Sequence, residues 1–230
     1  MRYNNVHKGI FIDRPNRFIA HVMVCEDGVS KVETVHVKNT GRCRELLIPG
    51  ETTVYLEKSS NPERKTRYDL IAVEKAGFGL INIDSQAPNK VVAEWLSKQD
   101  VAYVKPEYVY GDSRLDFYIE RDNEKYLMEV KGCTLEIDGV GYFPDAPTER
   151  GVKHLRELIK ATERGYRCIA AFVIQMENVY EVRPNEVMHA EFAKAVLQAK
   201  EAGVNFLYLP CFVKPQELVI DDRCKFIQLN

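Results

Sequence analysis

The first 85 residues alternate apolar and polar positions over short runs, which is the pattern of half-buried β-strands. The runs are residues 17–24, 31–37, 52–58, 68–75 and 79–84. Turn-forming sequences such as Glu26-Asp27-Gly28 separate them, and no convincing helical period interrupts them. About five strands without a helix predict a small β-barrel, most simply an OB-fold, with a small β-sandwich as the alternative.

Helical spacing of apolar residues begins after residue 84. The predicted helices are residues 89–98, 148–165 and 184–202, and the predicted strands are residues 101–111, 114–120, 125–132, 168–176 and 204–213. This order of helix, three strands, helix, strand, helix and strand predicts a mixed α/β domain with helices on both sides of a central sheet. We therefore expect two domains, residues 1–85 and 86–230, and an α+β protein overall.

Composition excludes several classes of protein. The chain has 230 residues, 45% of them hydrophobic and 29% charged, with a net charge of −2, as in ordinary globular proteins. The net charge neither indicates nor excludes a nucleic-acid partner, because a local basic surface matters more than the total. The six cysteines form no CxxC pair and the five histidines no HxH or HxxxH pair, which argues against a zinc site.

The same reading bears on location. The first residues lack the apolar core of a secretory signal, and no run approaches the ~18 apolar residues that span a bilayer. We therefore expect a cytoplasmic protein with reduced cysteines and no membrane partner. The sequence leaves the oligomeric state open.

Residues 114–132 predict a β-hairpin with acids on one face. A turn of two or four residues centred between Asp122 and Asn123 pairs Asp116 with Glu129 across the two strands. Their Cβ atoms would then be roughly 4.5–5.5 Å apart, with Lys131 one pleat along on the same face. The plain alternative is a solvated polar face. A repulsive acid pair is otherwise best explained by a divalent cation with oxygen ligands.

Two carboxylates beside a lysine are the arrangement that metal-dependent phosphodiester hydrolysis requires. The carboxylates hold Mg²⁺ or Mn²⁺, which polarises the scissile phosphate and lowers the pKa of a bound water. The lysine orients or deprotonates that water, or offsets the charge that builds up on the phosphate.

These residues also carry a family resemblance. Asp116 with Glu129-Val130-Lys131 resembles the metal-binding core of PD-(D/E)xK nucleases, whose order of elements matches residues 89–175. The segments RFIAHV, Asn39-Thr40-Gly41, SRLDF, EVKGCTL and GYFPDAPTERGVKHLREL are similar to the sugar fermentation stimulation protein A (SfsA) family across nearly the whole chain. The resemblance implies an N-terminal OB-like domain that binds nucleic acid and a C-terminal nuclease-like domain.

Carried over by position, the resemblance implies Asp116 and Glu129 as metal ligands and Lys131 as the catalytic lysine. Glu94, on the helix before the sheet, matches the place of an additional catalytic acid in many nucleases of this superfamily, with Glu107 as a weaker candidate. Both are otherwise ordinary polar positions.

Basic residues predict where nucleic acid binds. Arg150, Lys153 and His154 lie in the first turns of a predicted helix, where backbone N–H groups also favour phosphate. Two basic loops of the predicted barrel add to them, since loops are where OB-folds bind oligonucleotides. Solvated surface charge is the alternative for each. The complete set is Lys38, Asn39, Arg42, Arg44, Lys65, Arg67, Arg114, Arg150, Lys153 and His154.

Two functions remain open at this stage. The first is a metal-dependent nuclease-like protein that hydrolyses DNA or RNA, with DNA as the expected partner. The second, which the family's name implies, is a non-catalytic DNA-binding transcriptional regulator of sugar (maltose) metabolism. The intact set of Asp116, Glu129 and Lys131 favours the enzyme, because a pure binder has no need of a repulsive acid pair.

Overall fold

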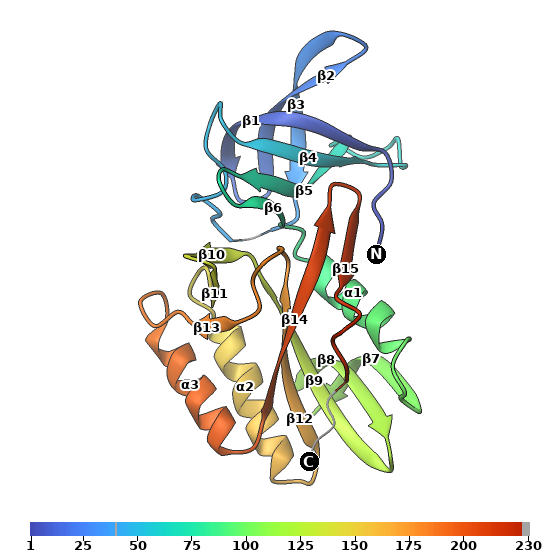
Figure 1. The fold of residues 1–230 in the computed structure, drawn as a ribbon, viewed down its shortest axis with the longest axis vertical. Coiled ribbons are helices and arrows are strands. Elements are labelled where there is room, and N and C mark those ends of the chain that lie inside the picture. Colours follow the sequence, from blue (N-terminus) through green and yellow to red (C-terminus); the bar gives the residue numbers. More distant parts are fainter. Residues whose placement is uncertain (40, 227–230) are drawn as a thin grey trace. The chain divides into compact units, whose positions relative to one another are not determined.

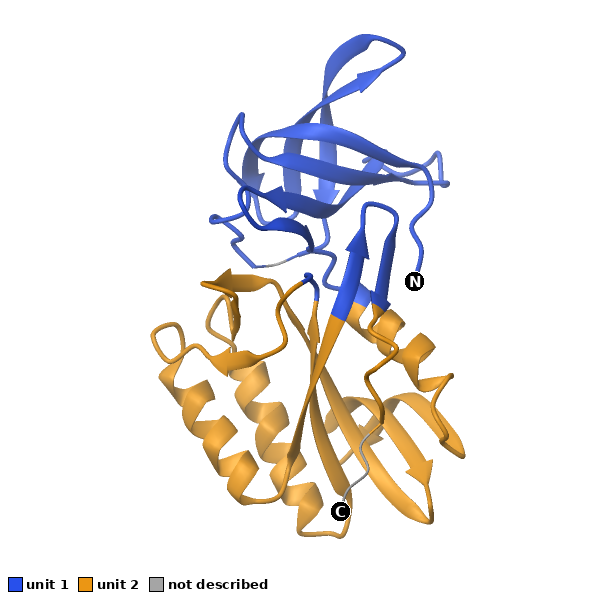
Figure 2. Cartoon of the chain, in the orientation of Figure 1, with its two compact units in different colours: residues 1–87, 175–177, 211–219 blue, residues 88–174, 178–210, 220–230 orange. Residues whose placement is uncertain are grey.

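The protein is described by a computed structural model over residues 1–39 and 41–226, and it divides into two compact units (Figure 2). Unit 1 consists of Met1–Ala87, Gln175–Glu177 and Cys211–Val219. Unit 2 consists of Pro88–Ile174, Asn178–Pro210 and the described residues from Ile220 onward. Two short segments from the second half of the chain thus belong to unit 1. The predicted division into domains 1–85 and 86–230 stays a prediction.

Unit 1 is a closed β-barrel (Figure 1). The strand order is β3-β2-β1-β4-β5-β6, and a parallel pairing of β3 with β5 joins the sheet to itself, so that five strands close and β6 extends β5. This is the topology of an OB-fold. The predicted barrel is confirmed, and the sandwich alternative is wrong. The strands are β1 Val6–Asn16, β2 Ile19–Glu26, β3 Val29–Val37, β4 Thr53–Lys58, β5 Tyr68–Lys75 and β6 Gly79–Asn82.

The longest strand of the barrel, β1, was not predicted from the sequence. It pairs with both β2 and β4 and therefore lies in the middle of the sheet. Gly9 shows why its pattern is atypical: a Cβ atom there would lie 2.5 Å from Val22 Cγ1 and 2.9 Å from the Met23 carbonyl oxygen. Gly9 is needed because the neighbouring strand approaches its backbone closely. Together with the charged residues around it, this glycine obscures the alternation of apolar and polar residues on which the strand prediction relied.

Unit 2 is built on most of a six-stranded mixed sheet of order β15-β14-β12-β9-β8-β7, of which the end of β14 and most of β15 are assigned to unit 1. β12 runs parallel to both β9 and β14, while β7, β8 and β9 are antiparallel neighbours. The predicted mixed central sheet is confirmed. Its strands are β7 Tyr103–Tyr110, β8 Ser113–Arg121, β9 Glu124–Cys133, β12 Arg167–Ile174, β14 Asn205–Lys214 and β15 Glu217–Ile220, and a second small sheet contains β10 Leu135–Ile137, β11 Val140–Phe143 and β13 Val182–Pro184.

Helices cover both faces of this sheet, as predicted (Figure 1). On one face, Trp95 of α1 and Tyr126 of β9 both pack against the ring of Phe226. Alternation along β9 directs Glu129 to the opposite face, where it contacts His154 of α2. The helices are α1 Ala87–Leu96, α2 Glu149–Thr162 and α3 Ala190–Glu201.

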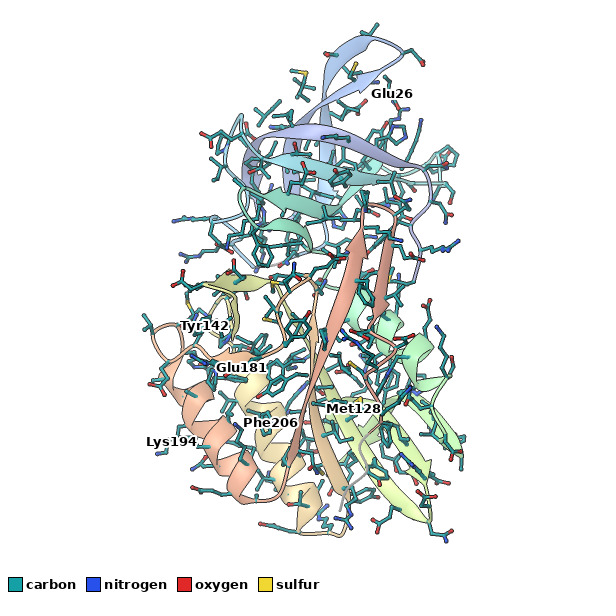
Figure 3. The ribbon with its side chains drawn as sticks, viewed as in Figure 1. Glu26, Met128, Tyr142, Glu181, Lys194 and Phe206 are labelled. Atoms are coloured by element: carbon teal, nitrogen blue, oxygen red, sulfur yellow. The ribbon has the colours of Figure 1, made fainter. Side chains whose placement is uncertain are left out.

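Local signals set the helix limits. Thr148 caps α2, since its side chain accepts a hydrogen bond from the Gly151 amide, as its place at the start of the predicted helix suggests. The predicted start of the third helix at residue 184 is wrong, because Pro184 belongs to β13 and α3 begins at Ala190. Figure 3 shows Lys194 on the outer side of α3 and Met128 within the sheet region. No helix in the described ranges is long and apolar enough to cross a membrane.

Candidate active site in unit 2 and basic surface of unit 1

The β8–β9 hairpin has the register that its turn predicts. The turn contains two residues, Asp122 and Asn123, both with positive φ, as a type I′ turn requires. Pairing runs from Arg121 opposite Glu124 to Phe117 opposite Met128. The predicted register is therefore confirmed, and it directs the carboxyl groups of the next two residues in line to one face of the sheet.

Asp116 is held from two sides by hydrogen-bond donors. Its Oδ2 accepts from the backbone N–H of Val130 at 2.7 Å, and its Oδ1 accepts from the side-chain amide of Asn89 at 2.7 Å. Burial raises the pKa of Asp116 above its ordinary value of 3.8, and the negative charge of Glu129 raises it further, although these donors act in the opposite direction. The direction of this pKa shift agrees with the predicted repulsion between the two acids.

Glu129 is almost completely buried, with 3% of its surface exposed. Its Oε1 accepts from Lys131 Nζ at 2.5 Å and from His154 Nδ1. Burial alone would raise the pKa of Glu129, but the His154 hydrogen bond and the Lys131 charge outweigh it, so that the pKa is lowered and the carboxylate is ionised. Its other oxygen, Oε2, is buried and has no hydrogen-bond partner among the described residues.

A buried, ionised oxygen without a hydrogen-bond donor destabilises the folded protein unless a cation or another ligand binds to it. The neighbouring Asp116 supplies a second carboxylate, and oxygen ligands of this kind suit Mg²⁺, Mn²⁺ and Ca²⁺. The residues therefore fit a divalent cation.

His154 connects Glu129 to the start of α2. Its Nδ1 faces a carboxylate, which only accepts, and its Nε2 faces the Nε of Arg150 at 3.3 Å, which only donates. The neutral imidazole with the proton on Nδ1 satisfies both contacts. His154 was predicted to contact nucleic acid, but it is 5% exposed and instead holds a site carboxylate.

The structure thus brings Asp116, Glu129 and Lys131 together and adds two residues around them. His154 was predicted for a different task, and Asn89 was not predicted at all. The only sequence signal for Asn89 was its position two residues after the start of α1, where a side chain can face the sheet. The catalytic roles of the three predicted residues remain a prediction at this point.

Glu94 lies exposed on α1, five residues after Asn89. Five residues turn a helix by about 500°, which places Glu94 on a different side of α1 from the residue that contacts Asp116. Glu107 lies on β7 with a positive φ of 51° and forms an ion pair with Arg114 at 3.5 Å. The part of either acid in catalysis stays a prediction.

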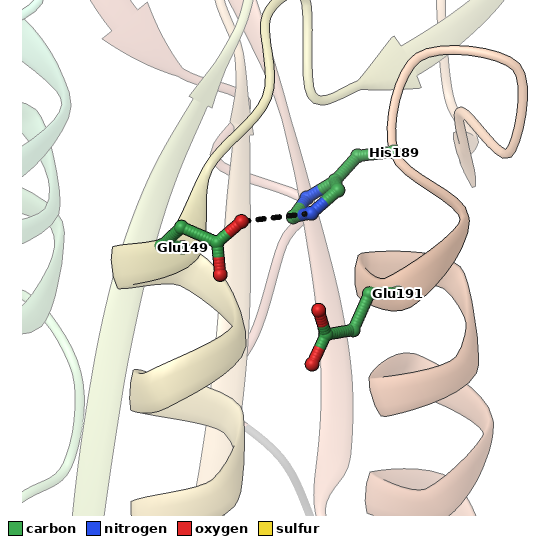
Figure 4. Close-up of side chains that lie close together, drawn as sticks. All are labelled: Glu149, His189 and Glu191. Atoms are coloured by element: carbon green, nitrogen blue, oxygen red, sulfur yellow. Dashed lines mark ion pairs between the residues drawn. The ribbon is translucent and has the colours of Figure 1, made fainter.

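A second group of metal-type side chains lies where α2 and α3 begin (Figure 4). One ligand atom each of Glu149, His189 and Glu191 lie within 4.8 Å of one another. His189 Nε2 is 3.4 Å from Glu149, and Glu191 is already paired with Arg156 at 2.7 Å. Both acids are exposed and already have side-chain partners, so we favour the buried acids at Glu129 as the metal site.

Two residues of the predicted basic loops have internal partners in unit 1. The Lys38 side chain is 12% exposed, and its ammonium lies 3.1 Å from Asp69 and 3.6 Å from Asp84. Burial opposes the charge of Lys38, but these carboxylates outweigh it and raise its pKa. Asn39 donates to the Ile83 carbonyl and accepts from the Gly41 amide. Both side chains therefore stabilise the loop, and Thr40, the next residue along the chain, lies outside the described residues.

The other predicted basic residues are all exposed, and they differ in their partners. Arg42 and Arg44 line a pocket of about 440 Å³ together with Arg14 and Arg17, which were not predicted. In contrast, Arg67 is paired with Glu33 at 3.4 Å. Lys65, Arg114, Arg150 and Lys153 are exposed as well.

Comparisons with known proteins agree on the identity of both parts of the chain. The family model described as "Sugar fermentation stimulation protein RE domain" matches residues 86–217, and "SfsA N-terminal OB domain" matches residues 12–83. A sugar fermentation stimulation protein homolog from Ruminiclostridium cellulolyticum is 53% identical over 227 residues, covering 97% of this chain and 98% of the homolog. One from Clostridium beijerinckii is 52% identical over 226 residues, covering 96% and 97%.

A solved structure agrees as well. The structure of Pyrococcus furiosus SfsA in complex with Ca²⁺ is 29% identical to this chain, with a TM-score of 0.82, and the match covers 96% of this chain and 95% of that one. With family models over both parts and relatives above 50% identity along nearly its whole length, the chain belongs to the sugar fermentation stimulation protein (SfsA) family.

Proposed function

We propose that this protein is a divalent-metal-dependent nuclease that hydrolyses phosphodiester bonds of DNA or RNA, with its catalytic site at Asp116, Glu129 and Lys131. The observation that carries the proposal is the buried, unpartnered Oε2 of the ionised Glu129 next to Asp116. A protein that only binds DNA has no use for an uncompensated carboxylate oxygen at this depth. That a relative from Pyrococcus furiosus was crystallised with Ca²⁺ supports a cation in this family.

Asp116 and Glu129 would hold the cation, for which we propose Mg²⁺ or Mn²⁺. When bound, such an ion polarises a phosphate oxygen and lowers the pKa of a coordinated water. Hydrogen bonds fix both ligands in advance: Asn89 and the Val130 amide orient Asp116, while His154 and Lys131 bind Glu129 through Oε1 and leave Oε2 for the ion. The site is therefore preorganised by the protein itself.

Lys131 supplies the positively charged side chain that phosphodiester hydrolysis needs at this site. Its ammonium is 2.5 Å from Glu129 Oε1 and partly exposed, so it can also donate to a phosphate oxygen or to the attacking water. Donation to the phosphate stabilises negative charge as the new bond forms. Exposed basic residues near the start of α2, Arg150 and Lys153, can contact the flanking phosphates.

The OB domain supports nucleic acid as the partner, since this fold commonly binds oligonucleotides. We propose DNA as the main substrate. A cytoplasmic location also remains our proposal, and the lack of a disulfide among the six cysteines, all of them within the described ranges, agrees with it.

A cleavage assay tests the proposal. Single-stranded and duplex DNA and RNA are incubated with Mg²⁺ or Mn²⁺ and with wild-type protein, Asp116→Ala or Asp122→Asn. Asp122 lies in the turn of the same hairpin and is exposed, so Asp122→Asn is a matched control for the loss of one acid. We expect Asp116→Ala to lose about 100-fold or more in rate, corresponding to roughly 3 kcal/mol of metal-assisted stabilisation, while the control stays active.

The same assay separates the regulator from the enzyme. Equal nucleic-acid binding by wild type and Asp116→Ala, without cleavage by either under any metal condition, would refute the nuclease. It would leave a DNA-binding regulator of sugar metabolism as the function.

A further inference from the structure

The pocket of unit 1 that contains Arg42 and Arg44 has the chemistry of a nucleotide site. Its volume is about 440 Å³, within the ~300–1,000 Å³ usual for small-molecule sites. Phe11, Leu47 and Pro49 form apolar parts of its lining, and Arg14, Arg17, Arg42 and Arg44 form the basic parts. We propose that this pocket, called here the arginine pocket, binds one nucleotide of a single-stranded nucleic acid, with phosphate at the arginines and the base against the apolar lining.

Arg14 is a fixed cation at this site. Its guanidinium donates to four backbone carbonyl oxygens, those of Arg17, Asn39, Gly41 and Arg42, at 2.6–2.9 Å. All four acceptors are neutral, so the hydrogen bonds hold the group in place without cancelling its charge. The fixed charge therefore contributes to the potential felt by an anion in the pocket.

The charges of the other three arginines are also not neutralised by an acidic partner among the described residues. Within residues 1–39 and 41–226, no carboxylate forms an ion pair with Arg17, Arg42 or Arg44, and all three are exposed. Arginines elsewhere in unit 1 are paired: Arg64 binds Asp69 at 2.7 Å and Arg67 binds Glu33 at 3.4 Å. Four arginines in one small pocket, none of them in an ion pair among the described residues, are therefore a distinctive feature of this domain rather than general surface charge.

The pocket contains one acid, and a histidine already satisfies it. Asp13 Oδ1 lies 2.7 Å from His21 Nδ1. The pocket thus favours an anion overall. Phosphate fits best, because guanidinium groups bind its oxygens in pairs.

The apolar lining distinguishes a nucleotide from a bare phosphate. Phe11 and Leu47 are buried core residues that reach the pocket wall, while Pro49 is exposed at its edge. A wall of this kind can cover the face of a base only if the base is free of its duplex partner and neighbours. The proposed ligand is therefore a single-stranded segment, and a duplex would reach only the outer arginines.

Binding of fluorescent oligo(dT) to the full chain in EDTA, measured by anisotropy, tests the arginine pocket without requiring cleavage. The test variant is Arg17→Gln with Arg44→Gln, since Arg14 must stay to satisfy the four carbonyls. The control is Arg2→Gln with Lys31→Gln, which removes the same two positive charges from exposed, acid-paired residues of unit 1. Thermal melts confirm that both variants fold.

We expect the test variant to raise Kd for oligo(dT) by roughly one to two orders of magnitude and the control to change it less than about threefold. The salt dependence of log Kd should fall by about 0.7 for each phosphate contact removed. An oligonucleotide of the same length with abasic sites should bind the wild type more weakly than oligo(dT). In amide NMR spectra, thymidine monophosphate should shift Gly41, Arg42 and Leu47, and thymidine or inorganic phosphate alone should do so less.

Three outcomes would overturn the inference. They are unchanged oligo(dT) affinity in the test variant, equal affinity for duplex and single strand, and equal affinity for abasic and normal strands. The inference shares only the nucleic-acid partner with the proposed nuclease. If the arginine variant loses oligo(dT) binding but the wild type shows no cleavage, only the nuclease proposal fails. If the wild type cleaves but the arginine variant binds normally, only the arginine pocket fails.

Discussion

Asp116→Asn should make the metal-free protein more stable, although it removes a ligand of the proposed site. Asparagine keeps both hydrogen bonds: its carbonyl can accept from the Val130 amide, and its NH₂ can donate to the Asn89 side chain once that exposed amide turns over. What is lost is the charge next to Glu129. The substitution therefore isolates the electrostatic cost of the acid pair.

The magnitude can be estimated from ordinary cross-strand spacing. Two unit charges about 5 Å apart, at an effective dielectric constant of about 20, repel by roughly 3 kcal/mol. Losing the attraction to Lys131 and the charge-assisted character of two hydrogen bonds offsets about 2 kcal/mol of this. A net gain of about 1 kcal/mol remains, which corresponds to roughly 2–4 °C in Tm for a domain of 150–250 residues.

The pH dependence of stability gives the sign of the effect of Asp116→Asn. The raised pKa of Asp116 means that the folded state binds its proton more tightly than the unfolded state does. Wild-type stability therefore falls as pH rises from the ordinary value of 3.8 through the raised pKa, and it stays lower above that. The advantage of Asp116→Asn should be complete at pH 7 and should shrink as pH falls toward 3.8.

Thermal melts in EDTA at several pH values measure this, with Asp122→Asn as the matched control. Adding Mg²⁺ or Mn²⁺ should raise the Tm of the wild type more than that of Asp116→Asn. A variant that melts below the wild type at pH 7 would refute the reasoning. So would an equal metal shift in both proteins.

Four further predictions test other parts of the structure. Lys131→Met should abolish cleavage but keep the metal-dependent rise in Tm, because Lys131 binds Glu129 rather than the ion. His154→Ala should lower the free energy of unfolding by about 2–4 kcal/mol, through a lost charge-assisted hydrogen bond and a buried void, and calorimetry measures this. Gly9→Ala should destabilise the barrel by about 1–3 kcal/mol in denaturant titrations, because its Cβ would lie 2.5 Å from Val22 Cγ1. Burial would raise the pKa of Asp69, but Arg64, His36 and Lys38 lower it, so Asp69→Asn should lower Tm near neutral pH and by less as pH falls through that lowered pKa.

The site was predictable where local rules fix geometry. The Asp122-Asn123 turn sets the register of the hairpin, and register plus alternation places Asp116 and Glu129 on one face. The role of Asn89 could not be predicted from the sequence, because its contact depends on how the first turn of α1 packs on the sheet. His154 was assigned to phosphate because the sequence shows a basic residue in a first helical turn but not its burial.

The same limit applies to the basic loops of unit 1. The sequence shows which residues are charged but not which charges are already paired. Lys38 was grouped with Arg42 and Arg44, yet the structure gives it carboxylate partners and gives the arginines none among the described residues. Arg14 was missed because it lies near the end of the unpredicted strand β1. Arg17 opens the predicted strand 17–24 and was therefore assigned to a strand rather than to a basic loop.

The arrangement around Glu129 is hard to explain by stability alone. Two donors bind the same oxygen, Oε1, while Oε2 is buried without one, and a second acid is held alongside. Moving Lys131 or His154 to Oε2 would satisfy the carboxylate, and asparagine at 116 would remove the repulsion without losing a hydrogen bond. A site that keeps its donors on one oxygen and its repulsion intact is arranged for something that binds between the acids. The stability of Asp116→Asn without metal and its Tm response to metal thus both measure the electrostatic cost of this arrangement, which we propose a bound cation offsets.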